Sequence, residues 1–482
     1  MLEATAHQQL KHLLQRDHST WPHHLTLSRL VARGLRRRDR ALLQLEPGSQ
    51  EHWWLGLLVP LCLQSRHVVL VIEEPLQRRL LRCERERLKE AGLSLACWTE
   101  STPPAGDQLW VLTTEGVLRA HQQGLLTPDH HLVIPEAERF GQQLRQCLSL
   151  QVGPREWEQL RLAHPCADAG LLDLHQRLST RLFAQATCSD AHVRLDGSEL
   201  VALRDLLRLL GPLPQPWDDV VAADPDHWVS WAALDHRLLQ WDWHLDVLEP
   251  IQPLGAVLGG QPALLISTDG ASDHLPQELT AAGIALDVQV HLREPSMLEP
   301  LPLFAPRRQP LPNTEVFAEH LLDQSRRLIL GRTGVTVLLL NDSSMRQKLT
   351  SELAGEFGSR VLHESTGPDS NGVICCSWSW WLEHQDRLPL PEQLIIAMLP
   401  LASLDTPLTA ARVDALKRQG RDWFRDLLLP EALSQLAPAV APLRRSGGRL
   451  AILDGRVRAR SWGEHVLSAL QPWTPLQRLL PQ

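Results

Sequence analysis

The chain has 482 residues, which is enough for two or three domains of ordinary size with large cores. Its 43% hydrophobic and 22% charged residues are normal for a globular protein. Because it has neither an apolar run of about 18 residues nor a charged-then-apolar leader, we expect no membrane attachment and a cytoplasmic location. The formal net charge of −8 excludes a protein that coats nucleic acid through bulk charge, so such binding would need local basic patches.

Cysteine usage predicts no metal centre. The eight cysteines include no C-x₂-C pair and no spacing suited to a tetrahedral zinc site, so we expect buried free thiols. They are Cys62, Cys83, Cys97, Cys147, Cys166, Cys188, Cys375 and Cys376.

The first candidate site is a row of arginines near the N terminus. Residues 1–20 are polar and predicted to be partly helical, and a further helix is expected from Leu25 onward. Five arginines follow at spacings that place most of them on one helical face: Arg29, Arg33, Arg36, Arg37 and Arg40. This face is either an ordinary solvated surface or a contact surface for nucleic-acid phosphates.

The next segment is framed like a phosphate-binding loop. The apolar strand Ala41–Leu45 precedes it, and an apolar helix start at residues 55–60 follows. Such a loop needs small residues for close backbone approach, a Lys for the β- and γ-phosphates and a Ser or Thr for Mg²⁺. Here the flanking strand and helix are present but the residues that would bind phosphate and Mg²⁺ are not. An ordinary strand–loop–helix connection with no nucleotide-binding role therefore remains an alternative. The candidate nucleotide-loop residues are Gly48, Ser49, Gln50, His52, Trp53 and Trp54.

Strands and helices then alternate. Near-continuous apolar runs at residues 67–72, 108–114 and 131–134, separated by helical stretches, predict a doubly wound α/β domain with a parallel sheet. Helical periodicity dominates residues 139–250. The four tryptophans near the end of this interval either pack between helices or stack on bases; they are Trp228, Trp231, Trp241 and Trp243.

The second half of the chain repeats the pattern. The sheet resumes at residues 262–270, and a proline-rich segment at residues 295–312 marks the expected domain boundary. A second α/β unit follows, with a predicted helix at 343–357 and predicted strands at 335–340, 372–376 and 393–401.

Taken together, these landmarks resemble the DinG/XPD-type superfamily-two helicases. The loop stands where that family has E-A-G-T-G-T-G-K-T, with Gln50 and His52 at two glycines and Trp53 and Trp54 at the Lys and the Mg²⁺-binding Thr. Residues 132–138, LVIPEAE, stand where a family strand ends in D-E-A-H. The fullest match covers residues 393–463, which present the family's L-P-F, P-x-x-P-L, G-x-x-x-F, L-P-x-A, I-L-D-x-R and Y-G landmarks in order.

The resemblance implies two RecA-like doubly wound parallel-sheet lobes with a helical insertion in the first. Residues 1–138 would begin the first lobe, 139–255 would form an arch-like helical insertion, 256–305 would end the lobe, and 306–482 would form the second lobe.

It also implies that the catalytic set is reduced to remnants. Pro135 replaces the metal-holding Asp of D-E-A-H, while Glu136 remains at the position that polarises water. In the sixth motif Pro442 replaces one arginine finger and Arg445 keeps the other, within a basic strip that includes Arg444 and Arg449.

We therefore expect no bound ATP or Mg²⁺ and no iron–sulfur cluster, since the family's four-cysteine set has no equivalent here. The leading hypothesis is a monomeric helicase-family pseudoenzyme that binds single-stranded or junction DNA, or a repair or replication partner, without ATP turnover. One alternative is an active ATP-dependent DNA helicase with a non-standard nucleotide site. Another is a protein-interaction scaffold without nucleic-acid affinity.

Overall fold

The computed structural model describes residues 2–17, 21–45, 53–185, 192–195, 197–224, 227–268, 274–292 and 299–476. The chain divides into two compact units. The first unit comprises Met1–Leu45, Ser49–Leu292 and Ser403–Arg421, and the second comprises Glu46–Gly48, Arg293–Ala402 and Asp422–Gln482. The loop candidates Gly48, Ser49, Gln50 and His52 lie outside the described residues, as does Cys188.

The first unit is built on a seven-stranded parallel sheet in the order β11-β1-β10-β5-β2-β4-β3. Its strands are β1 Ala41–Leu45, β2 Val68–Val71, β3 Cys97–Trp98, β4 Leu109–Leu112, β5 His131–Pro135, β10 Ala263–Ser267 and β11 Val288–Leu292. Most of them are short apolar runs buried on both faces, as expected for a parallel sheet.

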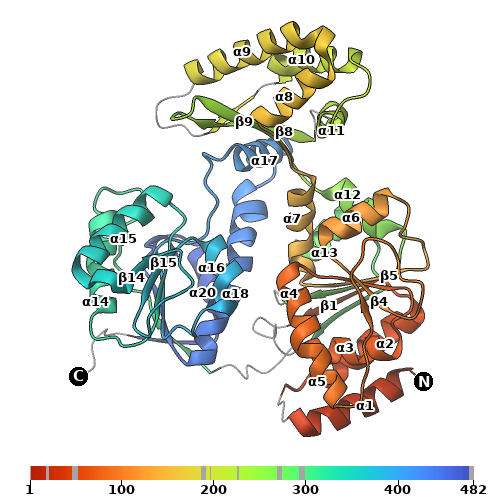
Figure 1. Cartoon of the computed structure of the whole chain (residues 1–482). Helices are drawn as coiled ribbons and strands as arrows, with labels where there is room; N and C mark the ends of the chain where they lie inside the picture. The colour runs from red at the N-terminus through yellow and green to blue at the C-terminus, as the bar shows by residue number, and fades with distance from the viewer. Residues whose placement is uncertain are drawn as a thin grey trace. The chain divides into compact units, whose positions relative to one another are not determined.

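Helices cover both faces of this sheet (Figure 1). Alternate strand residues point to opposite layers: Leu43 and Leu70 face one core cluster, while Leu42 and Val69 face the other. The first layer holds α1 Leu2–Asp17, α2 His24–Arg37, α3 Trp53–Leu63, α4 Glu74–Arg79, a π-helical turn Leu80–Glu84 and α5 Arg85–Glu90. The second holds α6 Thr114–Gln122, α7 Ala137–Leu148, α12 Ile251–Gly259 and α13 His274–Ala281.

An insertion follows α7. Its helices are α8 Pro154–Ala163, α9 Asp168–Gln185, α10 Gly197–Leu209 and α11 Trp217–Ala222. They pack on an antiparallel sheet in the order β6-β9-β8-β7, formed by β6 Leu150–Val152, β7 His192–Arg194, β8 Trp228–Asp235 and β9 Gln240–Val247. The insertion is therefore helical on one side only, and the sheet is an addition to the purely helical segment expected from the sequence.

One helix that is separated in sequence from the rest of the first unit nevertheless belongs to it. It is α17, Pro407–Arg418, which contacts β7 and β8 of the insertion. In Figure 1 it lies directly against the strands of this sheet. Buried Arg412 of α17 donates to Glu249 Oε1 at 3.1 Å, and Arg194 Nη1 of β7 lies 3.2 Å from Asp414 Oδ2. These ion pairs hold α17 on the insertion.

The second unit has its own seven-stranded parallel sheet, in the order β14-β15-β13-β16-β17-β12-β18. The strands are β12 Leu301–Phe304, β13 Thr336–Leu339, β14 Val361–His363, β15 Val373–Cys376, β16 Gln393–Ile396, β17 Arg449–Ile452 and β18 Trp473–Pro475. Strand β12 lies within the proline-rich segment that was expected to be a boundary, and it pairs with β17 and β18 of this sheet.

Helices again cover both faces of the second sheet. One core cluster contains residues of α16 Trp378–His384, α18 Leu429–Ser446 and α20 Gly463–Ala469, and the other contains residues of α14 Phe317–Ile329 and α15 Ser343–Phe357. The short helix α19 spans Arg456–Ala459, and a π-helical turn, Phe424–Leu428, leads into α18. None of the described helices of either unit has the length and apolar character needed to cross a membrane.

Candidate functional site

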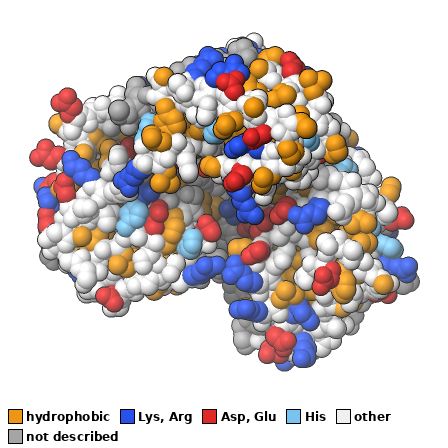
Figure 2. Space-filling model, turned by 45° about the horizontal axis from the view of Figure 1, so that its top comes forward, with side chains coloured by type: hydrophobic (Ala, Val, Ile, Leu, Met, Phe, Trp, Pro, Cys, Tyr) orange, Lys and Arg blue, Asp and Glu red, His pale blue; other side chains and the backbone are white. Residues whose placement is uncertain are grey.

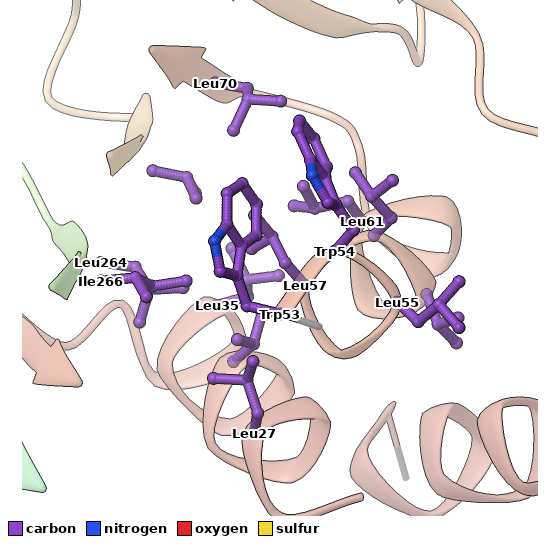
Figure 3. Close-up of a cluster of buried hydrophobic side chains, with 14 of the residues drawn as sticks. Leu27, Leu35, Trp53, Trp54, Leu55, Leu57, Leu61, Leu70, Leu264 and Ile266 are labelled. Atoms are coloured by element: carbon purple, nitrogen blue, oxygen red, sulfur yellow. The ribbon is translucent and has the colours of Figure 1, made fainter. Parts of the chain in front are cut away.

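The start of α3 is the centre of the candidate nucleotide site, and two indoles occupy it. Trp53 and Trp54 are 1% and 0% exposed. Their rings stack with centroids 4.3 Å apart and planes 27° from parallel. Figure 3 shows both rings among the aliphatic side chains of the core, with Trp53 near Leu35 of α2 and Trp54 near Leu61. The two positions that the sequence resemblance aligns with a Lys and a Thr are thus part of the hydrophobic core.

The sequence of α3 explains why the helix start is buried. The described helix reads WWLGLLVPLCL and has no charged residue, so it has no polar face to turn toward water. Gly56 allows the closest approach to α2, because a Cβ there would lie 2.9 Å from Leu27 Cδ2 and 3.2 Å from the His24 carbonyl oxygen. The helix is therefore fixed between α2 and the sheet, with both indoles facing inward.

Arg79 brings a cation close to the indoles. The Arg79 guanidinium carbon lies 5.6 Å from the ring centroid of Trp54, and Arg79 Nε donates to Glu84 Oε1 at 3.1 Å. This cation is therefore already engaged by a ring face and a carboxylate. The indole nitrogens of Trp53 and Trp54 are buried and make no hydrogen bond to any described residue.

Carboxylates line the carboxyl edge of the first sheet, where α/β proteins bind ligands. Glu73 follows β2, Glu136 follows β5, and Glu138 lies in the first turn of α7. Glu73 Oε1 accepts from the Thr114 backbone N–H at 3.1 Å, while Glu138 Oε1 accepts from the Thr268 hydroxyl at 2.7 Å and from its N–H at 3.3 Å. This edge presents acids, which repel a triphosphate unless a metal or lysine offsets them.

Glu136, the predicted catalytic remnant, adopts the left-handed backbone conformation with φ 58° and ψ 42°. This conformation is uncommon for residues other than glycine, and it turns the chain from β5 into α7. Its carboxylate lies 3.5 Å from Arg139 Nη1. Across the described parts of the chain, no three His, Cys, Asp or Glu side chains are arranged to hold a metal.

The N-terminal arginines separate into two groups. Helix α2 ends at Arg37, so Arg40 does not share its face, contrary to the prediction from the sequence. Arg36 Nη2 lies 2.8 Å from Glu3 Oε1, and Arg29 is hydrogen-bonded to His7, so both tie α2 to α1. Arg33 and Arg37 are exposed and have no hydrogen bond or ion pair with described residues. On the face shown in Figure 2, acidic and basic side chains are interspersed.

Backbone carbonyl oxygens are the main hydrogen-bond acceptors for Arg40, Arg444 and Arg449. Arg40 Nε donates to the Gln261 carbonyl at 3.1 Å, and Arg40 also donates to the Gly259 carbonyl. Arg444 donates to four carbonyls, including those of Leu470 and Pro472. Arg449 is 9% exposed and donates to Gln393 Oε1 and to the Leu328 carbonyl. These guanidinium groups hold loops and strand ends in place.

The sixth-motif segment is helical throughout. Pro438 and Pro442 both lie inside α18, and exposed Arg445 lies in its last turn. A proline within a helix removes one hydrogen-bond donor and favours a bend, so the helix persists here through burial of its apolar side.

The four tryptophans singled out near the end of the insertion, Trp228, Trp231, Trp241 and Trp243, lie on strands rather than helices. Trp241 and Trp243 are buried in its core, and the Trp243 indole donates to Ser230 Oγ at 2.6 Å. Trp231 is partly exposed, stacks on His244 with ring centroids 4.1 Å apart, and donates to Asp246 Oδ2 at 2.6 Å. Trp228 is half-buried at the start of β8.

Several of the described cysteines have raised thiol pKa values, whereas Cys83, Cys147 and Cys166 are exposed rather than buried as the sequence led us to expect. Desolvation raises the pKa of the Cys62 thiol to about 12 and that of Cys147 to about 11, and it raises the pKa of Cys376 further. A thiol with such a pKa stays protonated near neutrality.

Two parallel sheets, each covered by helices on both faces, define a protein with two RecA-like lobes and an insertion in the first. Solved structures share this fold. Xpd4 from S. tokodaii aligns over 92% of this chain and 98% of its own length, with a TM-score of 0.61 and 12% identity. An apo form of XPD aligns over 94% and 99%, with a TM-score of 0.58 and 12% identity.

Sequence relatives agree with the fold. The ATP-dependent DNA helicase YoaA of Haemophilus influenzae is 29% identical over 251 residues, which cover 48% of this chain and 39% of YoaA. Escherichia coli YoaA is 27% identical over 179 residues, covering 34% and 28%. The 3'-5' exonuclease DinG of Bacillus subtilis is 34% identical over 80 residues, covering 16% and 9%.

The matched regions thus span well under two thirds of these relatives, and no model of a known protein family matches the chain. In sequence the chain is thus similar to the YoaA and DinG proteins over part of its length, and in fold it is similar to XPD.

Proposed function

We propose that this chain binds single-stranded or junction DNA as a helicase-family pseudoenzyme that does not hydrolyse ATP. The observation that carries the proposal is the buried pair Trp53 and Trp54 at the start of α3. Phosphate binding there requires a lysine ammonium, a hydroxyl ligand for Mg²⁺ and open space, and two core indoles provide none of them.

The acidic edge supports the same conclusion. Glu73, Glu136 and Glu138 each have a donor or a cation within the first unit. Loss of a single arginine finger lowers phosphoryl-transfer rates by a factor of about 10³ or more. In the register that the sequence resemblance implies, the loop lysine and the metal ligands are replaced as well. DNA as the ligand is supported by the names of the YoaA relatives and by exposed Arg33 and Arg37 on α2.

ATP turnover is tested with the purified chain, poly(dT) and Mg²⁺-ATP. We expect no heat of ATP binding by calorimetry and no phosphate release above the buffer rate. Nucleic-acid-stimulated hydrolysis that disappears in Glu136→Gln would overturn the proposal.

DNA binding is tested by fluorescence anisotropy with labelled single-stranded oligonucleotides over a range of salt concentrations. We expect affinity to fall as salt rises, because binding to phosphates releases counterions. Arg33→Glu with Arg37→Glu should weaken binding by about tenfold and flatten the salt dependence. The matched control is Arg82→Glu with Arg119→Glu, which makes the same charge change at two exposed positions elsewhere in the first unit. Equal weakening in both double variants would point to bulk charge rather than to binding at α2.

A further inference from the structure

A groove of about 580 Å³ lies between the insertion and α17, and every residue that lines it belongs to the first unit. One wall is the start of β8 with Trp228 and the nearby Leu248, together with Arg194 of β7. The other wall is the face of α17 that carries Asp414, Lys417 and Arg418. The volume falls within the range of small-molecule sites, about 300–1,000 Å³.

The charges in this groove do not balance. Asp414 is the one carboxylate among the lining residues, and it faces two cations: Arg194 Nη1 lies 3.2 Å from its Oδ2, and Lys417 Nζ lies 4.0 Å from its Oδ1. Arg418 is exposed and makes no ion pair or hydrogen bond within the described structure. Among the lining residues, three cations thus stand beside one anion, so the lining carries a net positive charge in a chain whose overall charge is −8.

The walls are held firmly. Arg412 is 9% exposed and donates to Glu249 Oε1 at 3.1 Å, while Arg145 Nη2 of α7 lies 3.9 Å from Glu249 Oε2. The indole of Trp228 packs partly against the insertion core, so one part of the ring is fixed while the residue still lines the groove. A cationic site beside a preorganised aromatic ring suits a ligand that has both phosphate and a flat base.

We propose that this groove binds one or two nucleotides of a single strand, with phosphate held by Arg194, Lys417 and Arg418 and a base against Trp228. The inference rests on the proposed nucleic-acid function and assigns it a second site, separate from the α2 arginines. An acidic peptide would use the three cations but would gain little from the indole, so the two classes of ligand differ in their dependence on Trp228.

The test uses the full chain with three fluorescein-labelled probes: a dT oligonucleotide, an abasic oligonucleotide of equal length, and poly-glutamate. Lys417→Glu with Arg418→Glu should weaken binding of both oligonucleotides by about tenfold or more. It should also reduce the slope of log affinity against log salt by about 0.7 for each phosphate that is no longer neutralised. The matched control is Arg177→Glu with Arg208→Glu, on α9 and α10 of the same insertion, which should leave affinity nearly unchanged.

The interaction with the base has its own readout. Trp228→Leu should weaken binding of the dT strand about five- to a hundredfold and leave the abasic strand unaffected, because only the former offers a ring to stack. Trp228→Phe should recover part of this affinity and serves as the conservative variant. Strands that contain 5-iododeoxyuridine should photo-crosslink to the peptide that contains Trp228.

The outcomes separate the two proposals. If the chain binds DNA and the α2 variant weakens it while the groove variants do not, the groove inference is wrong and the proposed function stands. If the chain binds no single strand at all, both fail. Binding of poly-glutamate equal to that of dT, with no effect of Trp228→Leu, would overturn the groove inference in favour of an acidic protein partner.

Discussion

The carboxyl edges of the two parallel sheets contain different structures. In the first unit the helix that follows β1 begins with two core indoles, and the neighbouring strand ends carry carboxylates. In the second unit the strand ends form a hydrogen-bonded network: Asp454 accepts from the Leu399 N–H, and Glu364 accepts from the Ser377 N–H and hydroxyl. At the first edge the start of α3 is part of the hydrophobic core, whereas the second edge has polar groups that fix its loops.

This difference bears on what the proposed loss of nucleotide binding would require of the fold. A buried apolar helix start contributes stability through surface removed from water, and it needs no bound phosphate to satisfy it. If the residues at each edge serve to stabilise the fold, substitutions at both edges should lower the free energy of unfolding.

Trp54→Ala should destabilise the first unit most. Truncation of a fully buried indole removes apolar burial and leaves a cavity, which costs about 4 kcal/mol in the free energy of unfolding. Urea denaturation followed by circular dichroism measures the change. Leu209→Ala is the control, because that side chain is 83% exposed, and it should change stability by less than about 0.5 kcal/mol. A Trp54→Ala protein as stable as the parent would contradict the core assignment.

Asp454→Asn should have the next largest effect, on the second unit. Asp454 is fully buried, its Oδ2 accepts from Arg456 Nη2 at 2.6 Å, and it also accepts from the backbone of Leu399 and Arg456. Loss of the charge leaves Arg456 without its counter-ion, which costs about 3 to 4 kcal/mol.

The matched control for that variant is Asp323→Asn, in the exposed pair with Arg327 on α14. A surface pair contributes no more than about 1 kcal/mol, so a similar loss of stability in both variants would rule out burial as the cause.

His131 should make the first unit sensitive to acid. Burial, together with a smaller contribution from nearby Arg38, lowers the pKa of His131 from 6.5 to about 4. Neither ring nitrogen has a partner among the described residues. Between pH 6.5 and 4 the His131 imidazole is protonated in the unfolded chain but not in the folded chain. The free energy of unfolding therefore has its full value above pH 6.5 and decreases as pH falls toward 4. The loss corresponds to roughly 3 kcal/mol.

The contribution of His131 is measured as the difference in unfolding free energy between the parent and His131→Leu at several pH values. Other histidines of the first unit, including His130 and His244, also have lowered pKa values because of burial, and this subtraction removes their effect. A difference that is constant from pH 7 to pH 4 would contradict the prediction.

Part of this molecule could be predicted from sequence, because the relevant signals are local. Apolar runs predict the central strands of both sheets but not the short or outer strands β3, β11, β12, β14 and β18. Helix α15 has the predicted bounds, since Asp342 caps it and Gly358 follows it. The insertion sheet was not predicted although residues 241, 243, 245 and 247 alternate as buried positions of a strand, because the helical spacing before them dominated the interpretation.

The arginines were harder to predict, for a different reason. Arg33 and Arg40 look alike in the sequence, yet Arg40 donates to carbonyls more than 200 residues away in the chain, and Arg444 and Arg449 likewise bind distant backbone. Most of these partners are backbone carbonyl oxygens, which every residue type has. The sequence therefore contains no pattern of residue types that would reveal the contacts. The cations of the groove were hard to predict for a similar reason, because Arg194 and Arg418 are far apart in the sequence and line the same groove only in the folded chain.

Thr268→Val should have the smallest of these effects, and it tests whether the acidic edge is structural. The Thr268 hydroxyl donates to Glu138 Oε1 at 2.7 Å and links the end of β10 to the start of α7. Valine keeps the shape but removes the donor, so we expect a loss of about 1.5 kcal/mol, as for a hydrogen bond to a charged group. Thr268→Ser keeps the hydroxyl and should lose less. If both variants unfold at the parental urea concentration, the Glu138–Thr268 link does not stabilise the unit, and the carboxylates of this edge would then need another reason to be there.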